Sequence, residues 1–132
     1  MRAHNLIWAS PGAHNPSFVI AEKDPAVLEK YMIDYINETV AAVGDYPFVW
    51  DVVNEAIDNA KGYIKESPWT IVDDFICKAF KTAKAASPNT KMYYNDYKHA
   101  SNIGIYKDKS DKVFKLVKDL KDRDCGIDGV GF

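Results

Sequence analysis

The sequence predicts an α/β fold in which four strands run parallel, in the order β-α-β-α-β-α-β. Three observations lead to this prediction: short apolar runs typical of strands, longer segments with helical apolar spacing between them, and helix starts marked by a capping residue and a proline. The apolar run at residues 47–53 is nearly continuous, as in a strand buried on both faces of a parallel sheet. Three helices cannot cover both faces of four strands, so the chain is expected to be a piece of something larger.

The elements follow from local signals along the chain. The first strand is expected over residues 2–8, and the turn residues at 10–17 are expected to form a loop. The first helix begins after Asp24, a favourable N-cap followed by Pro25, and ends at Gly44. The remaining elements are expected in this order: strand 46–53, helix 67–86, strand 91–94, helix 110–123 and strand 126–132.

The composition indicates one globular domain and argues against several classes of function. The 132 residues are 47% hydrophobic and 27% charged, with a net charge of -2 and a pI near 5.9. A nucleic-acid binder is normally basic, and the mixed charges at 107–123 indicate a solvated helix face, so no nucleic-acid partner is expected. No stretch is long enough to span a membrane, and the apolar run at 6–9 is too short for a signal peptide. Either the protein is intracellular or its natural start has been lost.

The sequence contains no pattern for a metal or a cofactor. His4, His14 and His99 lack metal-ligand spacing, and there is no glycine-rich phosphate loop. We therefore expect no metal site and no cofactor. Two cysteines are too few for a disulfide scaffold and nothing in the sequence places Cys77 near Cys125, so free thiols are expected.

Polar residues follow two of the predicted strands, at the positions where parallel α/β proteins carry their active sites. Asn54 and Glu55 come directly after the second strand, and a carboxyl in partly apolar surroundings can act as a general acid. The alternative for Glu55 is an acid at a helix start, stabilised by the helix dipole. Residues 95–97 occupy the equivalent position after the third strand. On the first strand, His4 could contact a sugar hydroxyl and Trp8 could stack on a sugar ring, with core packing as the alternative for both.

Several strings in the sequence, taken together, resemble glycoside hydrolase family 10, the endo-β-1,4-xylanases. Residues 2–8, RAHNLIW, resemble the family's third-strand motif, and residues 50–56, WDVVNEA, resemble its fourth-strand signature. Residues 67–89 are similar to the helix that follows, and 94–97, YNDY, and 127–132, IDGVGF, are similar to the fifth- and sixth-strand motifs. The resemblance covers the whole chain and implies a partial (β/α)₈ TIM barrel, strands three to six, with the chain as an incomplete family 10 catalytic domain.

The resemblance also implies roles for five residues. Glu55 matches the general acid/base of a retaining glycosidase, and Asn54 matches the residue that binds the sugar 2-hydroxyl. His4 and Trp8 match residues that line the subsite of the cleaved sugar, and Tyr97 matches a residue on the leaving-group side. The implied substrate is β-1,4-xylan or xylo-oligosaccharides, and intact members of the family are mostly secreted. The chain departs from the family pattern at Ala3, Ala9, Pro11 and Lys98, which changes the lining of the subsites rather than Glu55.

The family nucleophile is a second Glu on the seventh strand, beyond Phe132, and Asp51, Asp58, Asp96 and Asp128 are poor substitutes for it. Two interpretations remain open: a partial sequence of a xylanase, or a short non-catalytic protein that binds xylan weakly or is only a structural remnant. In the isolated chain the first and last strands would be open edges, which favours self-association. An exposed apolar inward face is expected to add to this tendency, formed by Ile7, Val49, Val52, Met92 and Val130.

Overall fold

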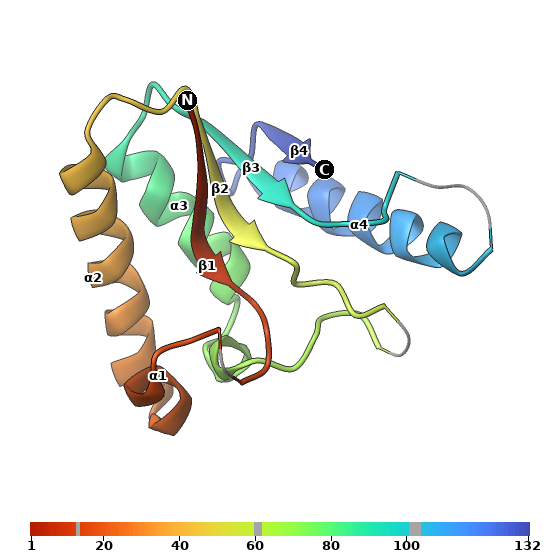
Figure 1. The fold of residues 1–132 in the computed structure, drawn as a ribbon, viewed down its shortest axis with the longest axis horizontal. Helices are drawn as coiled ribbons and strands as arrows, with labels where there is room; N and C mark the ends of the chain where they lie inside the picture. Colours follow the sequence, from red (N-terminus) through yellow and green to blue (C-terminus); the bar gives the residue numbers. More distant parts are fainter. Residues whose placement is uncertain (13, 60–61, 101–103) are drawn as a thin grey trace.

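The computed structural model describes residues 1–12, 14–59, 62–100 and 104–132, and its strands form one parallel sheet in the order β1-β2-β3-β4. Figure 1 shows the strands side by side in chain order, so β1 and β4 are the edges of the sheet. The predicted α/β order is confirmed. The strands are β1 (Arg2–Trp8), β2 (Val49–Asn54), β3 (Lys91–Asn95) and β4 (Gly129–Gly131), and the helices are α1 (Ser17–Ala21), α2 (Pro25–Val43), the 3₁₀ helix η1 (Pro68–Ile71), α3 (Phe75–Ala86) and α4 (Ile105–Asp122).

Helix α2 begins and ends where its sequence signals predict. The Asp24 carboxylate accepts a hydrogen bond from the Ala26 N–H at 2.9 Å, and Pro25 occupies the first turn. Gly44 follows the helix with a φ of 64°, a conformation that favours glycine. The buried face of α2 lies against the sheet and α3, and consists of Leu28, Met32, Ile36 and Val40.

One short helix was not predicted, and one predicted helix is wrong, at segments that contact the core. The loop expected over 10–17 is confirmed at 10–12 and 14–16, and residue 13 lies outside the described residues. Ser17 instead begins the short helix α1, in which the Pro16 carbonyl accepts the Val19 and Ile20 N–H groups and Val19 is buried. The helix expected over 67–86 is divided into η1 and α3. Asp74 has a φ of 53°, which interrupts the helix and leaves Trp69 buried in the core.

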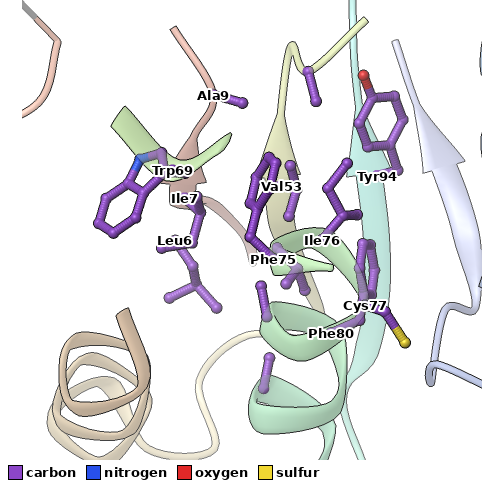
Figure 2. Packing of buried hydrophobic residues seen from close by; sticks show 14 of the residues in the cluster. Leu6, Ile7, Ala9, Val53, Trp69, Phe75, Ile76, Cys77, Phe80 and Tyr94 are labelled. Atoms are coloured by element: carbon purple, nitrogen blue, oxygen red, sulfur yellow. The ribbon is translucent and has the colours of Figure 1, made fainter. Parts of the chain in front are cut away.

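The hydrophobic core lies between the sheet and the helices, and Figure 2 shows part of it around Phe75 and Phe80 of α3. The prediction of an apolar inward face is wrong: Ile7, Val52 and Met92 have exposed fractions of 0–1% and belong to this core. Val49 is also buried, and Val130 packs against the core. The opposite face of the sheet is largely polar. His4, Asp51 and Tyr93 lie in register across β1, β2 and β3 on this face, and the Arg2 guanidinium donates to Asp51 and to Asn95.

The prediction of free thiols is also wrong, because Cys77 and Cys125 form a disulfide. Their Cα atoms lie 5.2 Å apart, within the range that a disulfide bridges, although 48 positions separate them in the sequence. Cys77 lies on α3, and Cys125 follows α4, where its N–H donates to the Leu120 carbonyl at 2.9 Å. The bond therefore joins α3 to the segment that leads into β4.

Candidate active site

The carboxyl ends of the strands meet along one edge of the sheet, as parallel pairing requires. Two backbone hydrogen bonds extend the pairing beyond the strands: Ala9 N–H donates to the Asn54 carbonyl at 3.0 Å, and Glu55 N–H donates to the Asn95 carbonyl at 2.9 Å. In β/α proteins with parallel sheets this edge is where active sites are built. Asn54 and Glu55 therefore lie where the sequence predicts them.

Glu55 has an unusual backbone and a fixed carboxylate. Its φ is 57°, a value that residues other than glycine rarely adopt, and such conformations gather at functional sites. The Trp8 Nε1–H donates to the Glu55 carboxylate at 3.1 Å. The side chain is half-buried, so the carboxylate is both anchored and open to a ligand. This arrangement suits a group that gives and takes a proton.

Trp8 connects Glu55 to an aromatic cavity. Its ring stacks on His14, with centroids 4.1 Å apart and planes inclined by 16°. Next to them is a cavity of about 310 Å³. Flat aromatic faces and amide groups in one cavity can hold a ligand with both apolar and hydroxyl faces. The cavity is lined by Asn5, Leu6, Trp8, His14, Asn15, Pro16, Phe18, Val19, Tyr31, Tyr35 and Trp69.

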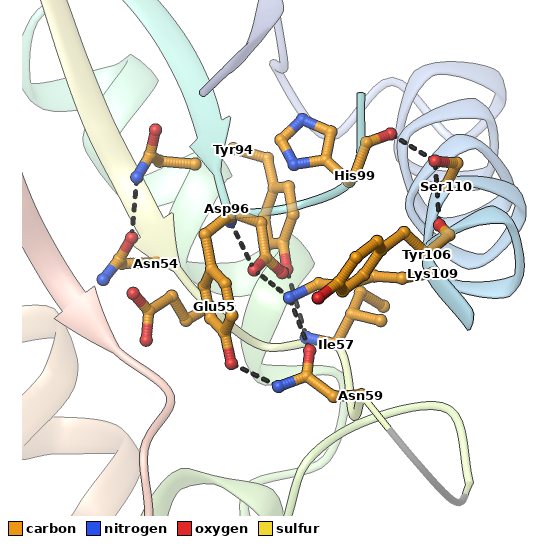
Figure 3. A network of polar contacts seen from close by, with 12 residues as sticks. Asn54, Glu55, Ile57, Asn59, Tyr94, Asp96, His99, Tyr106, Lys109 and Ser110 are labelled. Atoms are coloured by element: carbon orange, nitrogen blue, oxygen red, sulfur yellow. Dashed lines mark hydrogen bonds and ion pairs between the residues drawn. The ribbon is translucent and has the colours of Figure 1, made fainter. Parts of the chain in front are cut away.

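Asn54 is almost fully buried beneath this edge, with an exposed fraction of 1%. Its Oδ1 accepts a hydrogen bond from Asn95 Nδ2 at 2.9 Å, drawn in Figure 3. Asn54 Nδ2 donates to no described residue. An amide held on one side only can present its other side to a ligand.

His4 lies nearer to the amino ends of the strands than the other candidate residues do. It pairs in register with Asp51, and its Nδ1 lies 2.9 Å from Asp51 Oδ2. Arg2 also donates to Asp51, from Nε at 3.0 Å. The structure therefore joins Trp8 to Glu55 directly but gives His4 a different partner, four residues before Glu55 on the chain.

Tyr97 lies two residues beyond β3 and is held at three points. Its N–H donates to Asp96 Oδ1 at 2.8 Å, and its hydroxyl accepts a hydrogen bond from Asn59. The Lys109 ammonium lies 3.6 Å from the centre of the Tyr97 ring, within cation–π range. Tyr97 retains an exposed fraction of 37%, so it is positioned and still accessible.

Lys109 corrects the prediction that residues 107–123 form a solvated face. Its side chain is 2% exposed, and its Nζ lies 2.6 Å from Asp96 Oδ1 and 2.7 Å from Asn59 Oδ1 (Figure 3). A signal was present in the sequence, because Lys109 shares the helical spacing of the buried residues Val113 and Leu116. The helix starts five residues earlier than predicted because the first turns of α4 carry this inward-facing lysine among polar residues.

Two other titratable groups surround this ion pair. Burial raises the pKa of the Tyr94 phenol well above 10.0, and the Asp96 charge raises it further, so the hydroxyl stays protonated and donates to Asp96 at 2.6 Å. Burial lowers the pKa of His99 below 6.5, although the Asp96 charge opposes this shift. The His99 ring stacks on Phe132, with centroids 4.9 Å apart.

The described residues include no group of three or more histidine, cysteine or acidic side chains arranged to hold a metal ion. Within the same ranges, no helix combines the length and the apolar character needed to cross a bilayer. Among the described residues, the site brings together a carboxylate, amides, an indole and a phenol.

A parallel sheet with helical crossovers, and a carboxylate and an indole at its carboxyl edge, has the organisation of a β/α-barrel protein. The family model described as "Glycosyl hydrolase family 10" matches residues 1–132. The chain therefore belongs to glycosyl hydrolase family 10, as the sequence motifs indicate.

Named relatives agree with this assignment. The chain is 39% identical over 135 residues to endo-1,4-beta-xylanase B of Neocallimastix patriciarum, covering 98% of this chain and 15% of the relative. It is 35% identical over 136 residues to a beta-1,4-xylanase of Dictyoglomus thermophilum, covering 99% of this chain and 36% of the relative. The chain thus spans well under half the length of these relatives.

Solved structures show the same partial coverage. A psychrophilic family 10 endo-beta-1,4-xylanase superposes with a TM-score of 0.86 and 31% identity, over 98% of this chain and 41% of that one. The endo-1,4-beta-xylanase XylE of Penicillium canescens superposes with a TM-score of 0.82 and 36% identity, over 98% of this chain and 38% of that one. The four-stranded sheet thus matches part of a family 10 barrel.

Proposed function

We propose that residues 1–132 form the acid/base part of a retaining endo-1,4-β-xylanase, with Glu55 as the general acid/base. The observation that carries the proposal is the Glu55 carboxylate at the carboxyl edge of the sheet, held by the Trp8 indole N–H at 3.1 Å. A retaining glycosidase needs such a carboxyl to protonate the leaving oxygen and then to activate water. The names of the relatives, which are xylanases, supply the substrate class.

The neighbouring side chains have binding roles in this proposal. Asn54 contacts the sugar 2-hydroxyl with the amide nitrogen that no described residue occupies. Trp8 and His4 line the subsite of the cleaved sugar, and Tyr97 contacts the sugar on the leaving-group side. A family 10 structure that superposes over 98% of this chain is a complex with xylobiose, which supports xylan or xylo-oligosaccharides as the ligand.

The second carboxylate of the reaction is proposed to come from sequence outside residues 1–132. Asp51 is ion-paired with Arg2, and Asp96 is ion-paired with Lys109. Asp128 directly precedes β4 and so lies at the amino ends of the strands, whereas Glu55 lies at their carboxyl ends. Asp128 accepts a hydrogen bond from the Met92 N–H at 3.0 Å. Each of these carboxylates has a structural partner. The alternative is a short protein that binds xylan without cleaving it, and it rests on the same structural pairing of these carboxylates.

The disulfide supports export of the protein. Disulfides persist in oxidising compartments and are rare in the cytosol of most organisms, and this one joins Cys77 to Cys125. We therefore propose secretion, in agreement with an enzyme whose polymeric substrate lies outside the cell.

The test is Glu55→Ala in the intact protein that contains this chain. Loss of the general acid should lower kcat/KM on xylan by about 10²–10⁴-fold. An aryl xyloside with an activated leaving group should lose much less, because its leaving oxygen needs little protonation. Glu38→Gln, on the exposed side of α2, is the matched control and should leave both activities unchanged. Equal losses on the two substrates would contradict the acid role, and binding of xylan without any hydrolysis by the wild type would favour the alternative.

A further inference from the structure

We propose that Arg2 is a positioning residue that fixes the orientation of the Asn54 amide through Asn95. This inference rests on the proposed function, because it concerns how Asn54 presents itself to a sugar hydroxyl. It connects Arg2, on the polar face of the sheet, to Asn54, at the carboxyl edge that also carries Glu55.

Two hydrogen bonds connect β1 to β2 by way of β3. Arg2 Nη2 donates to Asn95 Oδ1 at 2.7 Å, and Asn95 Nδ2 donates to Asn54 Oδ1 at 2.9 Å. Arg2 begins β1, whereas Asn95 and Asn54 end their strands, so the guanidinium reaches along the polar face toward the carboxyl edge. Figure 3 shows the second of these hydrogen bonds beside Glu55.

The direction of both hydrogen bonds follows from the chemistry of arginine. A guanidinium has five N–H donors and no acceptor, and it stays protonated at any physiological pH. The Asn95 atom that faces Arg2 must therefore be the oxygen. Asn95 is left with its NH₂ group for Asn54, and Asn54 must accept with its own oxygen. The Asn54 NH₂ group then points the other way and is available to donate to a ligand oxygen.

The guanidinium itself is held in a built position. Asp51, with an exposed fraction of 2%, accepts from Arg2 Nε at 3.0 Å and lies 2.8 Å from Arg2 Nη2. Gly131 of β4 provides the space on the other side, since a Cβ there would lie 1.7 Å from Arg2 Nη2. Asp51 of β2 and the space beside Gly131 of β4 thus hold the Arg2 guanidinium in place.

We call the two hydrogen bonds from Arg2 through Asn95 to Asn54 the relay. The relay predicts that Arg2 affects the recognition of one substrate hydroxyl, the 2-hydroxyl, rather than every step of the reaction. An Asn54 amide fixed as a donor binds a hydroxyl oxygen and gains nothing from a substrate that lacks this oxygen. Loss of the relay lets the amide rotate, which removes the preference for its donor orientation. The penalty should therefore appear only on substrates that carry the 2-hydroxyl.

The experiment compares an aryl β-xylobioside with its analogue deoxygenated at C2 of the sugar that is cleaved, using the intact protein. Asn95→Asp is the decisive variant, because the new carboxylate still accepts from Arg2 but cannot donate to Asn54. It should lower kcat/KM about tenfold to a hundredfold on the hydroxylated substrate, and less than about threefold on the deoxy analogue. Arg2→Met should show the same selective loss. Asn89→Asp, in an exposed turn, is the matched control and should change neither value.

The outcomes separate this inference from the proposed function. Equal losses on both substrates in Asn95→Asp, with the wild type active, would overturn the relay and leave the proposed function in place. A wild-type protein that cleaves neither substrate would overturn both. If Arg2→Met fails to fold because Asp51 loses its partner, Asn95→Asp decides the question, since it keeps the Arg2–Asp51 ion pair.

Discussion

Replacing Lys109 by methionine removes the positive partner of a buried ion pair, together with a hydrogen bond to Asn59 and a cation–π contact with Tyr97. Lys109 Nζ lies 2.6 Å from Asp96 Oδ1, and the two side chains have exposed fractions of 2% and 0%. Methionine retains a flexible stem of similar length, so the apolar packing of the lysine stem is largely kept. The change in the free energy of unfolding then measures mainly the cost of leaving the buried Asp96 without its cationic partner.

The contacts that remain set the magnitude of the effect. Removal of one partner from a buried ion pair costs about 3–5 kcal/mol. Asp96 keeps two donors in the variant, the Tyr94 hydroxyl at 2.6 Å and the Tyr97 N–H at 2.8 Å. These donors place the expected loss near the lower limit, about 3 kcal/mol.

The assay is equilibrium unfolding of the intact protein in guanidinium chloride, followed by tryptophan fluorescence. The double variant Lys109→Met/Asp96→Asn should be more stable than Lys109→Met alone, because no buried charge is left uncompensated. Lys118→Met, whose partner Asp122 is exposed, is the control and should cost less than about 1 kcal/mol. A loss below about 1 kcal/mol for Lys109→Met, or no recovery in the double variant, would refute the reasoning.

Three further outcomes are expected. Reducing the Cys77–Cys125 disulfide, which closes a loop of 48 residues, should lower the stability by up to about 4 kcal/mol, measured by unfolding with and without reductant; the Cys77→Ser/Cys125→Ser variant should not respond to reductant. Because the pKa of folded His99 lies below 6.5, the unfolded chain binds the proton first, so stability should fall as the pH drops through 6.5, and His99→Phe should flatten this slope in unfolding curves from pH 7.5 to 5. The isolated chain, with β1 and β4 as open edges, should self-associate in size-exclusion chromatography with light scattering, and a sharp 14.9 kDa monomer peak would contradict this.

Strand and helix positions were predictable wherever the deciding signal is local. Residues 2–8 form β1 as predicted, and Asp24 with Pro25 starts α2, because a capping side chain acts on N–H groups within its own turn. Short segments held by distant contacts were not predictable. The short helix α1 at Ser17–Ala21 was not expected from the sequence, and the burial of Val19 holds it against the core.

The polar face of the sheet shows a different limit. Strand β2 is a nearly continuous apolar run, so its alternation does not reveal which side chains face the helices. In the structure, Arg2 and His4 both contact Asp51, so this face of the sheet is polar. Tyr93 pairs with Asp51, and its neighbour Met92 lies on the other face, in the core. Only the pairing of β1 with β2 makes this choice visible.

The sequence by itself determined the order of the elements, the family motifs and the positions of Asn54 and Glu55 directly after a strand. These features depend on residues that lie close together along the chain. Only the tertiary structure decided the Cys77–Cys125 bond, the burial of Lys109 against Asp96, and the relay from Arg2. The partners in each are at least 13 positions apart, and they meet because parallel strands and their crossover helices bring distant segments to the same edge or face.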